Sequence, residues 1–229
     1  MGKQPLNEKQ QNQMTVYESN GIEVKLSPQI IKNYLVTGGG NVTDQEVGMF
    51  LNLCKAHKLN PWLRECYLVK YGNQCEIITG KEAFMKRAYD SLDYKGFKAG
   101  TIVVTKDNEL VYRDGAFTLP TDTLVGGWCK VTSERYNETI DSEVSFAEYC
   151  KYKDNKPSAE WGKKPATMIR KVAIVQAMRE AFPKNLGGMY IADEISVDES
   201  VLDNTPIESE TVIIDVPPID GESVSLDEI

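Results

Sequence analysis

The sequence predicts an α+β fold: a central antiparallel sheet with a β-hairpin, flanked by helices and followed by a disordered acidic C-terminal tail. Three observations predict this class. Segments with helical spacing precede, interrupt and follow a series of strand-like runs. The connections between those runs are too short for parallel crossovers, and the end of the chain changes abruptly to an acidic composition dotted with proline. The pattern indicates one folded unit without internal repeats.

Two helices are predicted before the first strands. Serine followed by proline at 27–28 is typical of an N-cap and a first helical position, and the glycines at 38–40 end that helix. A capping-box pattern opens the second helix at Thr43, and its apolar residues keep helical spacing to about His57. The Asn-Pro pair at 60–61 then stops it, because a residue before proline avoids the α region.

The stretch NPWLR at 60–64 forms a corner between this helix and the first strand. Its proline fixes the direction in which the chain leaves the helix. Trp62 is predicted to pack the corner as part of the core, since tryptophan in folded proteins is mostly buried. The alternative is that Trp62 contacts a nucleic-acid base.

The middle of the chain alternates between strands and helices. The runs ECYLVKY and QCEIIT flank Gly72-Asn73 and predict a hairpin. Further strands are predicted at 96–105, 109–117, 123–132 and 139–146, and helices at 81–92, 146–153 and 165–182.

Charge divides the chain into parts. The net charge is −8, yet residues 193–229 contain 12 Asp/Glu and no Lys/Arg, whereas residues 14–192 carry 24 Lys/Arg against 21 Asp/Glu, a net +3. The acidic part has too few large apolar residues to offset chain entropy. We therefore expect a flexible N-terminal segment at 1–20, a folded domain at 21–192 and a disordered tail at 193–229. The tail acts either as a solubilising segment or as a weak competitor for the basic body.

The composition predicts a cytoplasmic protein. No apolar run reaches the roughly 20 residues that a membrane span needs, and the N-terminus is polar rather than signal-like. The five cysteines lack a small-scaffold spacing and fit reduced thiols better than disulfides.

No enzyme, cofactor or metal site is predicted. The segment TGKE at 79–82 lacks both the upstream glycine and the Ser/Thr of a phosphate-binding loop, so it indicates a strand-to-helix turn. Cys54, His57, Cys66 and Cys75 do not show the close ligand pairs of a zinc site, and small buried thiols are the better interpretation. No nucleophile and acid match the single histidine.

Basic residues interleaved with aromatics are the remaining signal. Cations that follow phosphates and aromatic rings that support bases are typical of single-strand binding. The alternative is a solvated charged face. Arg170 and Arg179, nine residues apart on the last helix, point about 180° apart, so one of them is expected to pair with an acid such as Glu180 or Glu160. The candidate DNA-binding residues are Lys70, Tyr71, Lys81, Lys86, Arg87, Trp161, Lys163, Lys164, Arg170, Lys171 and Arg179.

Four separated motifs resemble a known family. They are LNPWLRECYLVKY at 59–71, TGKEAFMKRA at 79–88, WGKKPATMIRKVAIVQAMREAF at 161–182 and GGMY-x-x-DE at 187–194. Their order and residues are similar to the Bet or Red-beta family of phage single-strand annealing proteins, which is related to the RecT group. The resemblance covers residues 43–194.

The resemblance implies a recombination protein that binds single-stranded DNA and holds an annealed duplex intermediate in the cytoplasm of a bacterial host. It also implies that the protein works as a ring or helical oligomer without nucleotide hydrolysis. Arg179 resembles a DNA-contacting arginine of the family. Ala166-Thr167 depart from it by replacing a basic pair, which Lys163-Lys164 are expected to supply. A phage exonuclease or a host single-strand binding protein is a candidate partner, although only the acidic tail stands where the family carries its partner-binding domain.

A second function class competes with annealing. The charged faces would join subunits of a DNA-independent assembly or adaptor protein. Oligonucleotide binding that weakens steeply with salt separates the two, because phosphate contacts release counterions.

Overall fold

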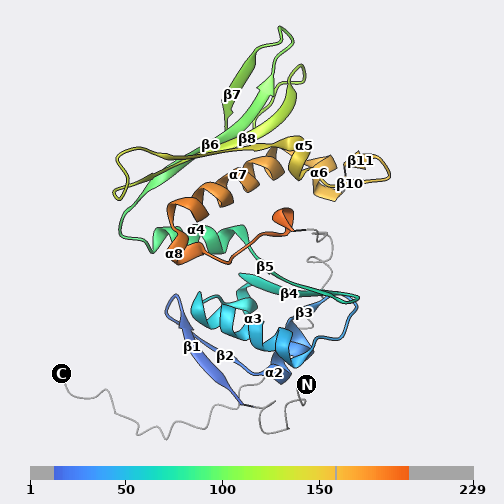
Figure 1. Cartoon of the computed structure of the whole chain (residues 1–229), viewed down its shortest axis with the longest axis vertical. Coiled ribbons are helices and arrows are strands. Elements are labelled where there is room, and N and C mark those ends of the chain that lie inside the picture. The colour runs from blue at the N-terminus through green and yellow to red at the C-terminus, as the bar shows by residue number, and fades with distance from the viewer. Residues whose placement is uncertain (1–12, 158, 196–229) are drawn as a thin grey trace, which may run out of the picture.

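Helix α7 (Pro165–Ala181) lies at the centre of the computed structural model, which describes residues 13–157 and 159–195. Nine of its residues are buried. A four-stranded sheet covers one side, and α4 (Lys81–Tyr89) and the single-turn α8 (Pro183–Leu186) cover the other (Figure 1). Because it is covered on both sides, α7 is apolar around most of its circumference instead of along one stripe.

The four-stranded sheet is antiparallel throughout and has the order β7-β6-β8-β9. Residues i and i+2 on each strand share a face, so alternate side chains point toward α7. Cys129 and Val131 on the α7 side are fully buried, whereas Lys130 between them is exposed. The strands are β6 (Tyr94–Val104), β7 (Leu110–Asp114), β8 (Thr123–Ser133) and β9 (Ile140–Ser145).

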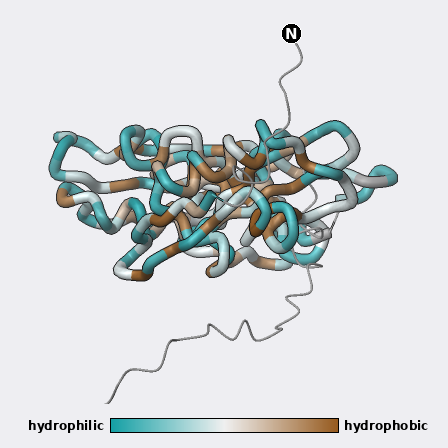
Figure 2. Tube along the Cα trace, turned by 90° about the horizontal axis from the view of Figure 1, so that it is seen from below, coloured by the Kyte–Doolittle hydropathy of each residue, from teal (hydrophilic) through white to brown (hydrophobic). Residues whose placement is uncertain are grey.

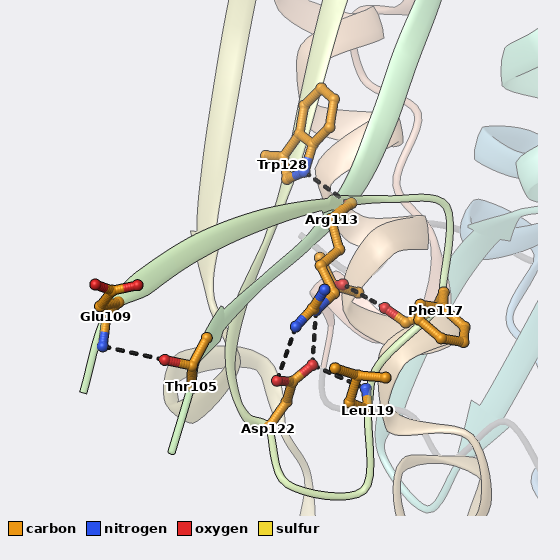
Figure 3. Close-up of polar contacts among 8 residues, drawn as sticks. Thr105, Glu109, Arg113, Phe117, Leu119, Asp122 and Trp128 are labelled. Carbon is orange, nitrogen blue, oxygen red and sulfur yellow. Dashed lines mark hydrogen bonds and ion pairs between the residues drawn. The ribbon is translucent and has the colours of Figure 1, made fainter. Parts of the chain in front are cut away.

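An ion pair fixes the chain between β7 and β8. Arg113 donates from Nε and Nη2 to the Asp122 carboxylate at 2.6 and 2.9 Å, and Asp122 also accepts from the Leu119 amide (Figure 3). The hydrogen bonds from Arg113 outweigh burial and lower the pKa of Asp122. On the same strands Trp128 Nε1 donates to the Arg113 carbonyl at 3.2 Å.

A smaller sheet of order β3-β4-β5 forms the second layer. The predicted hairpin is its main part: β4 (Cys66–Tyr71) and β5 (Gln74–Thr79) are antiparallel, with Tyr71 opposite Gln74. The strand β3 (Val36–Thr37) pairs with β4 in parallel, which the sequence analysis did not foresee.

Helix α3 (Asp44–Ala56) packs beside this sheet (Figure 1), and its start is as predicted. The Thr43 hydroxyl accepts from the Glu46 amide, and the Glu46 carboxylate accepts from the Thr43 amide, so both halves of the capping box are present. The Ser27 hydroxyl likewise caps α2 (Pro28–Ile30), which continues as a π-helical turn at Ile31–Leu35.

The N-terminal boundary of the folded part needs correction. Residues 1–20 were expected to be flexible, but β1 (Thr15–Ser19) and β2 (Ile22–Leu26) form an antiparallel hairpin. Tyr17 Oη donates to the Leu59 carbonyl at 2.6 Å, which ties the hairpin to the end of α3. Residues 1–12 lie outside the described part.

Short elements connect the antiparallel sheet to α7. They are α5 (Phe146–Tyr149), a small hairpin of β10 (Tyr152–Lys153) and β11 (Lys156–Pro157), and α6 (Ala159–Lys163). The helix predicted at 146–153 is therefore only one turn long. After α8 the chain returns along α7 and ends in a 3-10 turn at Ala192–Glu194.

The predicted fold class is confirmed: the described residues form an α+β structure with an antiparallel sheet, a β-hairpin and flanking helices. Figure 2 shows apolar residues gathered in the interior of this elongated molecule and polar residues along its loops. None of the helices in the described residues is long and apolar enough to cross a membrane. Of the predicted tail at 193–229, residues 196–229 lie outside the described residues.

Because α7 approaches β8 closely, a methyl group added at Gly127 of β8 is expected to lower the stability of the fold. A Cβ on Gly127 would stand 2.7 Å from the Ile169 carbonyl oxygen, which α7 backbone geometry holds in place. We expect Gly127→Ala to lower the free energy of unfolding by about 2 kcal/mol through overpacking. Gly48→Ala is the control, because its Cβ meets nothing within 4 Å and alanine favours a helix by about 0.8 kcal/mol. Urea unfolding followed by circular dichroism measures both, and equal stability of the two variants would contradict the packing described here.

Candidate nucleic-acid interface

The eleven predicted DNA-binding residues lie in three separate parts of the fold. Two are on the β4–β5 hairpin, three are on α4, and six are on α6, α7 or the residue between them. The hairpin tip and α6 extend from the lower and upper layers of the molecule (Figure 1). The structure therefore does not gather them into a single patch, and whether each contacts DNA stays a prediction.

Lys70 is buried, with only 5% of its surface exposed. Its Nζ donates to Glu46 Oε1 at 2.6 Å, which joins β4 to the first turn of α3. Burial opposes ionisation of Glu46, but the hydrogen bonds from Lys70 and the Thr43 amide outweigh it and lower the pKa of Glu46. Tyr71, the next residue, is exposed at the hairpin tip.

The cations of α4 also have acidic partners, and Lys81 Nζ lies 3.7 Å from Glu82 Oε1 at the surface. Lys86 pairs with the buried Glu65 carboxylate. Arg87 lies 3.2 Å from Asp90 and donates from Nη2 to the Lys58 carbonyl at 3.2 Å.

Trp161 belongs to the core and is 3% exposed. Its ring meets Phe146 edge-on at 5.7 Å between centroids, so a base cannot stack on it in this conformation. Lys163 and Lys164 lie at the surface, each with its Nζ 3.3 Å from the Glu160 carboxylate. These two lysines remain accessible to a phosphate.

The two arginines of α7 point in different directions, as their spacing predicted. Arg170 donates from Nε to the Ala99 carbonyl of β6 at 3.2 Å. Arg179 donates from Nη2 to both carboxylate oxygens of Glu194, and its guanidinium stacks 4.6 Å from the Tyr190 ring centroid. Arg179 is the arginine that pairs with an acid, and its partner is one that the sequence analysis did not name.

The same region shows that the predicted boundary of the acidic tail, at residue 193, lies too early in the chain. Asp193 is 4% exposed, and its Oδ2 lies 2.5 Å from Lys171 Nζ. Glu194 is the partner of Arg179. Residues 193 and 194 therefore belong to the folded part, because they neutralise cations on α7 that are partly withdrawn from water. The apolar residues Met189 and Ile191 just before them were the signal in the sequence, and both are buried.

Trp62 does not pack the corner as predicted: 47% of its surface is exposed. Polar contacts hold the corner instead. The Asn60 side chain accepts from the Trp62 amide at 3.0 Å, and Glu65 Oε2 accepts from the Asn60 amide at 2.8 Å. Leu59 and Pro61 supply the buried apolar contacts, so the indole is free to face outward.

Cations missed by the sequence analysis surround this corner. Each of them is exposed and forms no ion pair with any acid in the described part of the chain. The four residues are Lys55, Lys58, Arg64 and Lys184. Two of them flank NPWL in the sequence, which was the available signal. Lys55 lies in the last turn of α3, close to the corner in the sequence, and only Lys184 of α8 is brought there by the fold.

The cysteines are free, as predicted. Cys54 and Cys66 are buried with their Sγ atoms 3.3 Å apart, and burial raises the pKa of Cys66 well above its usual range. No group of three His, Cys, Asp or Glu that could hold a metal ion occurs among the residues that the structure describes. Gly80 is the N-cap of α4, which confirms the strand-to-helix turn.

Comparison with known proteins identifies the class. The model of the RecT family matches residues 13–208. The chain belongs to the RecT family, which is a family of single-strand annealing proteins of DNA recombination. The narrower resemblance to the Bet or Red-beta group stays a prediction.

A curated relative is the uncharacterized protein UU154 of Ureaplasma parvum serovar 3. It is 27% identical over 158 residues, which are 68% of this chain and 63% of that protein. The match thus spans less than two thirds of the relative's length.

The Lys70–Glu46 pair predicts a pH-dependent contribution to stability. Glu46→Gln removes the charge but keeps a side chain that suits the third position of a capping box, so we expect a loss of about 1.5 kcal/mol at pH 7. Because the pKa of Glu46 is lowered in the folded state, the contribution is complete above its ordinary value of 4.5 and disappears as the pH falls through the folded value. Urea unfolding from pH 7 to 3 measures this difference. The control is the exposed Glu82→Gln, and a constant difference between wild type and Glu46→Gln across that range would contradict the ion pair.

Proposed function

We propose that this chain binds single-stranded DNA and anneals complementary strands in phage-type homologous recombination, without nucleotide hydrolysis and as an oligomer on DNA. Family membership over residues 13–208 carries the proposal. The annealed duplex intermediate is the product that the oligomer holds. A phage exonuclease or a host single-strand binding protein is the proposed further partner.

Accessible cations support a phosphate-binding role. Lys163 and Lys164 are about two-thirds exposed or more, and their shared partner Glu160 balances only one of the two charges. Exposed ion pairs are weak, typically below about 1 kcal/mol, so a phosphate can replace Glu160 as their partner. In contrast, Lys70 and Lys171 are held by acids in surroundings largely withdrawn from water. We propose structural roles for these two.

A strand-annealing assay tests the function. Two complementary oligonucleotides labelled with a donor and an acceptor dye are mixed with the protein in the absence of any nucleotide. We expect the rate of energy transfer to rise well above the spontaneous rate, and the affinity for one strand to fall steeply between 50 and 300 mM salt.

The assay also addresses the competing function. A protein that self-associates but neither binds one strand at low salt nor accelerates annealing would be a DNA-independent assembly protein. Annealing that requires added ATP would contradict the proposed independence from hydrolysis.

A further inference from the structure

We propose that the corner between α3 and β4 is a contact site for single-stranded DNA, in which Trp62 stacks on a base and the surrounding cations hold phosphates. This inference rests on the proposed function and names a surface for it. It reverses the expectation that Trp62 is a core residue.

Tertiary contacts assemble the corner from three elements. Arg87 of α4 donates to the Lys58 carbonyl, and Lys86 of α4 pairs with Glu65 at the end of the corner. His57 Nδ1 lies 3.3 Å from the Asn185 carbonyl oxygen of α8, which places Lys184 beside the end of α3. The site is therefore built on packed helices rather than on a free loop.

The corner is more positive than the rest of the described chain. The segment 55–65, the segment 81–90 that contains α4, and Lys184 include three acids, Glu65, Glu82 and Asp90, each in an ion pair. Their cations are Lys55, Lys58, Arg64, Lys81, Lys86, Arg87 and Lys184, so the local net charge is +4. The described residues as a whole carry 24 Lys/Arg against 23 Asp/Glu, a net +1. Positive charge is thus concentrated where an anionic strand would gain most from it.

Trp62 gives the corner a surface for a base. The chain has three tryptophans, and the other two, Trp128 and Trp161, are 7% and 3% exposed. Leu63 beside it is 55% exposed, which extends the apolar area. Aromatic rings next to backbone-binding cations are the usual means of sequence-tolerant single-strand binding, because every base has a stacking face.

Another aromatic pair does not suit the same ligand. Tyr112 and Trp128 meet edge-on on the face of the sheet that points away from α7. Tyr112 Oη donates to Glu143 at 3.0 Å, and Asp141 lies on the same strand face with its charge balanced by Lys130. The acids beside this aromatic pair would repel phosphates, whereas the acids at the corner are fewer than the cations there.

Fluorescence anisotropy with a labelled oligothymidylate tests the stacking contact. We expect Trp62→Ala to weaken binding about tenfold, since a stacked base contributes on the order of that factor. Trp62→Phe should keep most of the affinity. Tyr152→Ala is the matched control, because Tyr152 is 59% exposed but lies on β10, and its affinity should equal that of the wild type.

Two further readouts belong to the same experiment. DNA should quench much of the wild-type tryptophan emission by stacking on the one exposed indole, and Trp62→Phe should abolish most of that quenching. Arg64→Ala and Lys58→Ala should each reduce the slope of log affinity against log salt by about 1. The exposed Lys106→Ala, on the β6–β7 turn, should leave the slope unchanged.

The outcomes separate this inference from the function it rests on. If the wild type does not bind the oligonucleotide, both fall. If the wild type binds and Trp62→Ala, with an unchanged melting temperature, binds equally well, the corner is not the DNA site although the function stands. If Trp62→Ala loses self-association in sedimentation but keeps its affinity for DNA, the exposed indole is a contact between protein subunits, and the inference is overturned.

Discussion

The packing of α7 between the antiparallel sheet and the layer of α4 and α8 is the constraint on which the rest of the structure depends. The helix comes close enough to β8 that only glycine fits at Gly127. Its nine buried residues leave little of its surface in water. Any cation on such a helix must reach the surface or meet an acid. Lys171 and Arg179 meet Asp193 and Glu194, and the chain after α8 returns along α7 to provide them.

This constraint gives basic residues two different roles. Lys70, Lys171 and Arg179 neutralise buried or half-buried acids, and each joins two elements of the fold. At the corner after α3, Lys86 also pairs with a buried acid, Glu65, whereas Lys55, Lys58, Arg64 and Lys184 are exposed and form no ion pair with an acid of the described residues. Net charge alone therefore says little about where an anionic strand would bind, because cations such as Lys70, Lys171 and Arg179 are already neutralised within the fold. The binding site of an anionic strand depends on which part of the surface stays positive after these pairs are formed.

Local signals in the sequence predicted local structure well. The capping box at Thr43, the turn at Gly72 and the end of the second helix near His57 each depend on residues close together in the chain, and the structure has all three. The site was less predictable, because burial and ion pairing depend on contacts between distant segments. Trp62 was expected inside because tryptophan is usually buried, but hydrogen bonds of Asn60 and Glu65 already hold the corner. Composition assigned Asp193 to a tail, although the apolar residues before it anchor the chain.

Lysine footprinting tests the central claim most directly. The full chain is treated with an amine-reactive reagent, with and without a bound single strand, and the modified lysines are identified by mass spectrometry. We expect the strand to protect Lys55, Lys58 and Lys184, while Lys98 and Lys106 on the sheet react equally in both samples. Lys70 should be nearly unreactive throughout, since it is buried against Glu46. Protection confined to Lys163 and Lys164, with the corner lysines unchanged, would contradict the account.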